Sequence, residues 1–323
     1  SGGRLCGLCQ GDLATLIDTR LYVPEAWAND GPRCEKAAIP DTARGYRSKT
    51  QLALAMLETA LHRGIHFGYV GIDGGYGKEP AFLRAVDRLG CRFVADVHSD
   101  QRIYLQDPEP RIPTGSGRGK PPRQRKAQTS AVRVDQWAAS QPADAWQRLT
   151  LRAGEKGVIQ ADYLHARVWV WDGHETAARC WHLLVRRDVG AETVSHYCLS
   201  NAPAATSLPT LARVQAQRFF IEHSFREAKQ ECGLADYQVR RWDAWHHHMA
   251  LVMLGTLFLL KQKKAGRPQW PMLSFSDLVT ALAHLLPRRH MTSAELAEVI
   301  TQRHRLRQKA KASCYRRTSV ALE

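Results

Sequence analysis

Apolar residues recur at two spacings over the first hundred residues, and their alternation predicts a sheet with packed helices. A strand is expected from about Thr15 to Val23. Leu54, Leu57 and Leu61 recur at helical spacing, which predicts a helix over residues 48–63. The two patterns belong together, because a sheet buries its apolar face under helices.

Three further elements follow the first helix. A short apolar strand is expected over residues 66–73, a helix opens at Pro80 and closes at Gly90, and another strand is expected over residues 91–97. Strand, helix, strand, helix and strand in succession are typical of strands joined by crossover helices. The expected fold class is therefore α/β.

The pattern changes after Asp100. Residues 101–130 are rich in Pro, Gly and Arg and predict a loop. Stretches typical of β-strands follow at Ala166–Trp171 and Trp181–Val185. The segment is therefore expected to be a β-rich insertion that interrupts the α/β domain.

Helical spacing returns at Ser207 and runs to about Cys232, with Pro209 suited to a first turn and Gly233 placed to end the helix. A further helix with a buried apolar face is expected over residues 242–264. The chain is thus expected to comprise an α/β domain in two parts, residues 1–100 and 205–290, a β-rich insertion with a basic loop, residues 101–204, and a basic C-terminal tail, residues 291–323.

The composition is that of a globular protein and excludes a membrane span. Of 323 residues, 44% are apolar and 24% are charged. The longest apolar run, Met249–Leu260, has 12 residues, whereas a span needs roughly 18. Among eight scattered Cys, only Cys6 and Cys9 form a C-x-x-C pair, so reduced thiols of a cytosolic protein are favoured over a four-ligand zinc site.

The charge balance indicates a polyanionic partner. Lys and Arg number 46 against 31 acids, for a net charge of +15, which is typical of nucleic-acid binding. Most of the excess lies in residues 115–126 and 301–323, where a solvated, flexible loop and tail are the alternative to phosphate contact. The candidate DNA contacts of the first segment are Arg118, Lys120, Arg123, Arg125 and Lys126.

Three other stretches each admit two interpretations. Arg240 and Arg241 either contact DNA or begin a helix with surface arginines. The run His246–His248 is interpreted as packing rather than metal ligation, because Met and Leu residues follow it. Trp169 and Trp171 either form the core of the insertion or contact an unpaired base.

Two acids stand in settings typical of active sites. Asp73 follows a short strand and precedes Gly74–Gly77, and such an acid opens onto the crevice of an α/β sheet; an ordinary turn residue is the alternative. On the predicted helix, Glu222 and Lys229 lie roughly 40° and 20° around the axis from Arg218. This stripe suits a metal-ligating acid between phosphate-binding cations, and a surface ion-pair ladder is the alternative.

The spacing Arg-x3-Glu-x6-Lys resembles the Y-R-E-K signature of insertion-sequence DDE transposases. With Gln in place of the signature Tyr, it falls on Gln215, Arg218, Glu222 and Lys229. Residues 221–248 look like the 701-like branch of the insertion sequence 4-like superfamily, and residues 71–77 look like the turn that holds the family's second catalytic Asp.

The resemblance implies a ribonuclease H-like catalytic domain with a mixed sheet, flanking helices and a β-rich insertion. It implies three acids that bind two Mg²⁺ or Mn²⁺ ions, with Asp73 as the second and Glu222 as the third, for phosphodiester hydrolysis and strand transfer. Arg218 and Lys229 would hold phosphates of double-stranded DNA at transposon ends and target. A homodimer in the synaptic complex and a cytoplasmic, nucleoid-associated location in a prokaryote are implied as well.

The family's first Asp lies upstream of a segment similar to Leu5–Pro24, so the chain is expected to lack that strand and its acid. The leading interpretation is a DDE transposase catalytic domain. The alternatives are a ribonuclease H-fold nuclease that cuts without joining and an inactive transposase remnant that binds DNA. We expect the Asp73 and Glu222 carboxylates to lie within roughly 4–8 Å of each other and DNA binding to depend steeply on salt.

Overall fold

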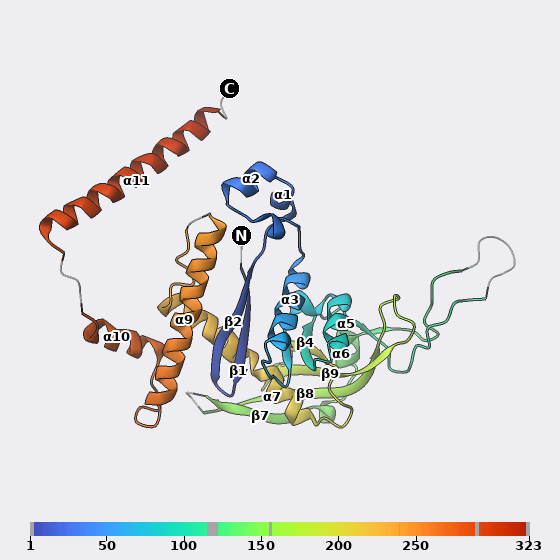
Figure 1. Ribbon diagram of the computed structural model, residues 1–323. Helices are drawn as coiled ribbons and strands as arrows, with labels where there is room; N and C mark the ends of the chain where they lie inside the picture. The colour runs from blue at the N-terminus through green and yellow to red at the C-terminus, as the bar shows by residue number, and fades with distance from the viewer. Residues whose placement is uncertain (1–2, 115–121, 155–156, 239, 288–290, 321–323) are drawn as a thin grey trace. The chain divides into compact units, whose positions relative to one another are not determined.

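The protein is represented by a computed structural model that describes residues 3–114, 122–154, 157–238, 240–287 and 291–320 (Figure 1). By its internal contacts the chain divides into two compact units, Ser1–Pro271 and Met272–Glu323, and each is described by itself. Of the predicted DNA contacts, Arg118 and Lys120 lie outside the described residues.

The first unit opens with a β-hairpin, of which the apolar pattern predicted one strand. Strand β1 (Gly3–Gln10) pairs antiparallel with β2 (Leu13–Leu21), and Gly11 in the turn takes a φ of 63°, which glycine adopts without strain. Figure 1 shows the hairpin between helices α3 (Lys49–His62) and α9 (Trp242–Gly266). Three short elements follow the hairpin: α1 (Glu25–Ala28), α2 (Gly31–Lys36) and the 3₁₀ turn Asp41–Ala43.

The predicted succession of helices and strands is present over the next fifty residues. Helix α3 begins with a capping box in which Ser48 and Gln51 satisfy each other's backbone N–H groups, as the expected start at Ser48 requires. The strand expected over residues 66–73 is shorter, because only three residues pair with a neighbour. The elements after α3 are β3 (Val70–Ile72), α4 (Gly74–Gly77), α5 (Pro80–Arg88) and β4 (Phe93–Val97).

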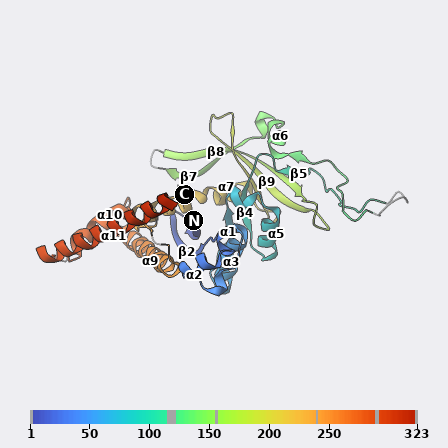
Figure 2. The same cartoon turned by 90° about the horizontal axis from the view of Figure 1, so that it is seen from above.

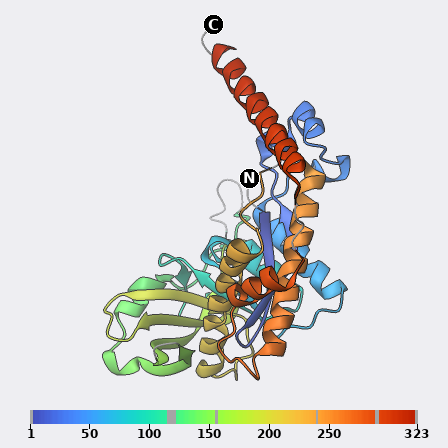
Figure 3. The same ribbon diagram turned by 90° about the vertical axis from the view of Figure 1, so that its left-hand side faces the viewer.

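Six strands of the described residues form one mixed sheet in the order β3-β4-β10-β9-β8-β7. Strands β3 and β4 are parallel, and the other neighbours are antiparallel. The last four are β7 (Gln147–Gly154), β8 (Gly157–Val170), β9 (Arg179–Asp188) and β10 (Val194–Ser200). Figures 2 and 3 show these strands, in green and yellow, extending away from the hairpin. The β-rich segment therefore extends the sheet that β3 and β4 begin.

Smaller elements connect β4 to β7. They are β5 (Arg102–Ile103), β6 (Val132–Arg133), α6 (Val134–Ala139) and the 3₁₀ turn Ala143–Ala145. Strand β5 pairs with β6, and Tyr104 pairs with Trp169 of β8 through an isolated bridge. These contacts hold the start and end of the predicted loop against the sheet.

The two faces of the sheet have separate cores. On one face, Ile72, Phe93 and Ala95 pack with Leu83 and Val86 of α5. On the other face, Val94 and Cys198 pack with Leu211 and other residues of helix α7 (Leu208–Ala216). Because side chains alternate between faces along a strand, Asp96 lies on the second face with Val94.

The helix predicted from Ser207 to Cys232 is two helices. Helix α7 ends at Ala216, and α8 (Arg218–Glu231) begins after Gln217. In α9, Trp245, Met249 and Val252 are buried, but Leu254 is 63% exposed and neighbouring apolar residues are exposed with it. One face of this helix is therefore buried as expected, and a second group of apolar residues on it is exposed.

The described part of the second unit contains two helices. Helix α10 (Phe275–Leu285) begins with a capping box between Ser274 and Asp277, and α11 (Ser293–Val320) is a single helix of 28 residues. The described part of the basic C-terminal segment is thus helical. The predicted division of the chain at residues 100, 204 and 290 stays a prediction.

The first unit has the predicted fold class: a curled mixed six-stranded sheet flanked by helices, which is ribonuclease H-like. None of the helices in the described parts of the chain combines the length and apolarity that crossing a membrane requires.

Candidate active site

Asp73 and Asp96 occupy neighbouring positions at the carboxyl ends of two parallel strands. Ile72 of β3 is the register partner of Ala95 of β4, so these acids are the next residues along their strands. Neighbouring strands lie about 4.8 Å apart, and register partners point to the same face. An ideal Cβ on Gly74 would lie 4.0 Å from Asp96 Cβ, which agrees with this proximity.

The Asp73 side chain is fixed by the backbone that follows it. Its Oδ1 accepts hydrogen bonds from the N–H groups of Gly75, at 2.8 Å, and Tyr76, at 3.2 Å, and thereby caps α4. Among the described residues, its Oδ2 has no hydrogen-bond partner. The residue is exposed, so one carboxylate oxygen is held in place while the other faces solvent.

Helix α4 lies directly on the backbone of Asp96. An ideal Cβ on Gly77 would lie 1.9 Å from the Asp96 carbonyl oxygen, a contact that no side chain can make. The glycine-rich turn predicted for close backbone approach therefore has a specific use at Gly77. It sets the position of Asp73 relative to β4.

Asp96 is a buried carboxylate with three polar partners. It is 9% exposed. Cys198 Sγ donates to Oδ1 at 3.0 Å, while Oδ2 lies 3.3 Å from His196 Nδ1 and accepts from Arg218 Nη1. Burial alone would raise the pKa of Asp96, but the bonds from His196 and Cys198 and the charge of Arg218 outweigh it and lower the pKa. The carboxylate is therefore ionised at neutral pH.

Arg218 joins this buried acid to the predicted catalytic glutamate. Its Nη1 donates to Asp96 and its Nη2 donates to Glu222 Oε1 at 3.1 Å. Its Cγ lies 3.4 Å from an ideal Cβ on Gly71, so the side chain crosses β3 on the face that Asp73 shares with Gly71. The structure thus brings Asp73, Arg218 and Glu222 to one end of one face of the sheet.

The electrostatics of Arg218 agree with a bridging role. Burial would lower the pKa of its guanidinium, but the charge of Asp96 and their hydrogen bond outweigh this and raise the pKa. The side chain is 23% exposed, against 66% for the side chain of Glu222. The guanidinium is therefore fixed from the buried side, and the glutamate extends from it toward solvent.

The donor chemistry of the two predicted acids fits a hard divalent cation. Asp73 and Glu222 offer carboxylate oxygens, which Mg²⁺ and Mn²⁺ prefer. Within the described ranges, no group of three or more His, Cys, Asp or Glu side chains is arranged to hold a metal ion. Magnesium is commonly held by one or two carboxylates, with water and substrate phosphate completing its shell, and two carboxylates suit that arrangement.

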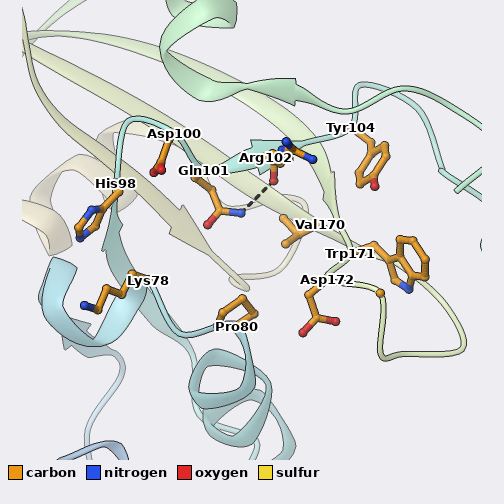
Figure 4. A pocket seen from close by; sticks show the side chains of 11 residues that line it. Lys78, Pro80, His98, Asp100, Gln101, Arg102, Tyr104, Val170, Trp171 and Asp172 are labelled. Atoms are coloured by element: carbon orange, nitrogen blue, oxygen red, sulfur yellow. Dashed lines mark hydrogen bonds between the residues drawn. The ribbon is translucent and has the colours of Figure 1, made fainter. Parts of the chain in front are cut away.

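A cavity of about 610 Å³ opens beside the Asp73 turn (Figure 4). Lys78, which follows α4, and His98 lie on one side of it, and Tyr104 and Trp171 lie on the other. Arg102 contributes a further cation. Two acids, Asp100 and Asp172, line it as well, so the cavity combines charges of both signs with aromatic rings. Lys78 follows Asp73 by five residues, which places it roughly 6–8 Å along α4.

The other predicted DNA contacts lie apart from this group. Lys229 is exposed on α8, roughly 10 Å along the helix from Glu222. Arg241 pairs with Asp243 at 2.9 Å. Arg125 donates to the Pro110 carbonyl at 3.0 Å. Among the rest, Arg240, Arg123 and Lys126 are exposed.

Two other predicted features have structural partners. Gln215, at the signature Tyr position, is 4% exposed and accepts a hydrogen bond from Tyr163 Oη at 2.9 Å. His246 Nδ1 and His248 Nε2 bond to backbone carbonyls at 2.9 and 3.0 Å. These contacts agree with the packing interpretation of the histidine run.

The sequence patterns did not point to Asp96 or to the charged and basic residues of the cavity. A signal for Asp96 was present, because it is the single acid in the apolar run Phe93–Val97 and an unpaired buried charge is costly. Lys78, His98 and Arg102 carry no comparable signal, because isolated basic residues in loops are common.

Comparison with known proteins agrees with the class that the fold and these acids define, a ribonuclease H-like domain with carboxylates at its strand ends. Residues 5–158 match a family described as DDE superfamily endonuclease. The matched stretch includes Asp73 and Asp96 and ends before α8. It supports a DDE-type endonuclease domain in this part of the chain. No curated protein matches the chain.

Proposed function

We propose that the chain is the catalytic part of a DDE transposase that cleaves phosphodiester bonds of double-stranded DNA with a divalent metal. The observation that carries the proposal is the arginine bridge. Because Arg218 contacts both Glu222 and Asp96, and Asp96 neighbours Asp73 at the strand ends, the arginine would hold Glu222 near Asp73. The similarity of residues 5–158 to DDE superfamily endonucleases supports the same chemistry.

Asp73 and Glu222 would hold Mg²⁺ or Mn²⁺, two ions in the complete site. Bound metal of this kind generates the attacking oxygen nucleophile and stabilises the leaving oxygen. The protein contributes pre-set geometry: the cap bonds orient Asp73, and the guanidinium of Arg218 orients Glu222. Positioning of this kind is the principal means of catalysis in phosphoryl transfer.

Substrate phosphates need cations beside the acids. Asp100 and Asp172 line the cavity next to the Asp73 turn, and Asp172 pairs with Arg84. The cavity also contains the cations Lys78 and Arg102, and Lys229 is a further cation on α8. These three cations would hold the DNA backbone near the scissile bond, with the basic residues of the 101–130 loop and Arg240 and Arg241 adding non-specific contacts.

The finer assignments follow the transposase resemblance. Strand transfer at transposon ends, a homodimeric synaptic complex and a cytoplasmic, nucleoid-associated location in a prokaryote are part of this proposal. A nuclease that cuts without joining would use the same acids. A strand-transfer assay that detects joined products separates the two functions.

The test is cleavage of supercoiled plasmid by the full chain with Mg²⁺ or Mn²⁺. We expect nicking by the wild type and none by Asp73→Asn or Glu222→Gln, with DNA affinity nearly unchanged in a gel-shift titration. Asp30→Asn is the matched control for the first, because Asp30 also caps a short helix, with Arg33 N at 3.0 Å. Glu231→Gln, on the same helix, is the control for the second.

Each outcome bears on one interpretation. Cleavage that persists in both acid variants contradicts the site assignment. A wild type that binds DNA but does not cleave it with either metal supports the alternative of an inactive, DNA-binding remnant. Equal loss of cleavage in the control variants would attribute the effect to folding rather than to the site.

A further inference from the structure

The Arg218–Glu222 contact differs from an ordinary pair of oppositely charged residues on a helix. Such pairs, four residues apart and exposed, contribute little to stability. In this pair the cation precedes the acid in the helix, and this arrangement is less stabilising than an acid followed by a cation four residues later. An exposed glutamate would therefore sample many positions if its partner were equally mobile.

Its partner is anchored. Asp96 accepts a hydrogen bond from Nη1 of Arg218, and Cys198 and His196 on β10 in turn hold Asp96 in place. The chain of contacts runs from β10 through β4 to α8. A guanidinium is planar and presents its donors in a rigid fork, so fixing one end of it fixes the direction in which the other end donates.

The same contacts set the charge of the site. One guanidinium between two carboxylates leaves a net charge of −1. If Asp96 lost its charge, the whole positive charge of Arg218 would act on Glu222, and it would compete with any cation for the same oxygens.

We propose that Asp96, acting through Arg218, is a positioning residue that directs Glu222 toward a divalent cation and prevents Arg218 from neutralising it. The inference rests on the proposed function, because it takes Glu222 as a metal ligand. It assigns Arg218 a role inside the protein, in place of direct contact with DNA phosphate.

The experiment measures metal binding without catalysis, by titrating the DNA-free full chain with Mn²⁺ and following the free ion by electron paramagnetic resonance. We expect Asp96→Asn to weaken Mn²⁺ binding by about 10- to 100-fold, the usual effect of losing a residue that supports a metal ligand. The matched control is Asp162→Asn on β8, because Asp162 is 7% exposed and also pairs with two arginines. It should bind Mn²⁺ as the wild type does.

A second variant separates charge competition from loss of structure. In the double variant Asp96→Asn/Arg218→Gln, the competing guanidinium is absent, so Mn²⁺ should bind more tightly than to Asp96→Asn alone. A purely structural role predicts the opposite, because the double variant loses more contacts. Plasmid cleavage should stay low in both, since Glu222 is no longer oriented.

The outcomes distinguish this inference from the proposed function. Wild-type Mn²⁺ affinity in Asp96→Asn, or no recovery in the double variant, overturns the inference. If Glu222→Gln also leaves Mn²⁺ binding unchanged, the proposed function fails together with it. If Glu222→Gln weakens binding and Asp96→Asn does not, only the role of Asp96 is wrong.

Discussion

The sheet contains two buried aspartates, Asp96 on β4 and Asp162 on β8, whose ion pairs with arginine are similar but have different roles. Each is less than a tenth exposed and contacts arginine. Arg148, the partner of Asp162, is 54% exposed and contacts no second acid among the described residues. Arg218 is more buried and continues to Glu222. An arginine that contacts two acids fixes the position of the second acid relative to the first. An arginine that contacts one acid and is otherwise exposed to solvent only stabilises that ion pair.

The physical causes of the two ionised states differ as well. At Asp162 the hydrogen bond from Arg148 is the largest influence on the pKa and lowers it. At Asp96 burial is the largest influence and opposes ionisation, and several partners together reverse it. Several partners are therefore needed to keep Asp96 ionised, and removing one of them leaves the opposing effect of burial less fully balanced.

Gly77→Ala is expected to displace the largest part of the site. Its Cβ would lie 1.9 Å from the Asp96 carbonyl oxygen, so α4 must shift and carry Asp73 with it. Overpacking of this kind costs about 1–3 kcal/mol or more. We expect urea denaturation to show a decrease in the free energy of unfolding near the upper end of that range. Gly74→Ala is the control, because its nearest contact is 3.9 Å. Equal stability of the two variants would contradict the close packing of α4 on β4.

Substituting Arg218 or Arg148 tests directly how the ion pairs of Asp96 and Asp162 differ. Arg218→Met leaves Asp96 buried beside His196 and Cys198, and breaking a buried pair from one side costs about 3–5 kcal/mol. Arg148→Met should cost less than about 1 kcal/mol, because Asp162 keeps Arg187 at 3.6 Å. Chemical denaturation of both variants at neutral pH measures the difference. A larger loss at Arg148 would reverse the comparison.

A smaller effect is expected from pH. The pKa of Asp96 is lower in the folded protein than the ordinary value of about 3.9 in the unfolded chain. Its ionised form therefore adds stability above about pH 4, and this is lost as pH falls through the folded pKa. The stability difference between wild type and Asp96→Asn should shrink as the pH falls from about 5 toward 3. A difference that grows on acidification would mean that the folded pKa is raised.

The smallest effect lies outside both sites, in the basic loop. Neutralising Arg118, Lys120, Arg123, Arg125 and Lys126 should lower the slope of log affinity against log salt for DNA, because fewer counterions are released. Mn²⁺ affinity should not change. Asp96→Asn should do the reverse, weakening Mn²⁺ binding with an unchanged salt slope. A loop variant with the wild-type slope would show that these residues do not contact phosphate.

The sequence predicts those parts of the site whose signals are local. Ser48 and the spacing of leucines predicted α3, and the glycines after Asp73 predicted a tight turn. The hairpin strand β1 was missed, and so was the break between α7 and α8 at Gln217, because helical spacing continues across it. Asp96 could not be interpreted from its neighbours, since its partners lie 100 or more residues away in the sequence.

Asp73 and Glu222 together are proposed to hold a divalent metal. The separation of their carboxylates, expected at roughly 4–8 Å, stays a prediction. The most direct measurement is anomalous diffraction from crystals of the full chain grown with Mn²⁺ and a short DNA duplex. The account predicts an anomalous peak within about 2.0–2.3 Å of a carboxylate oxygen of each residue. A peak at other side chains, or carboxylates more than about 12 Å apart on different faces, would contradict it.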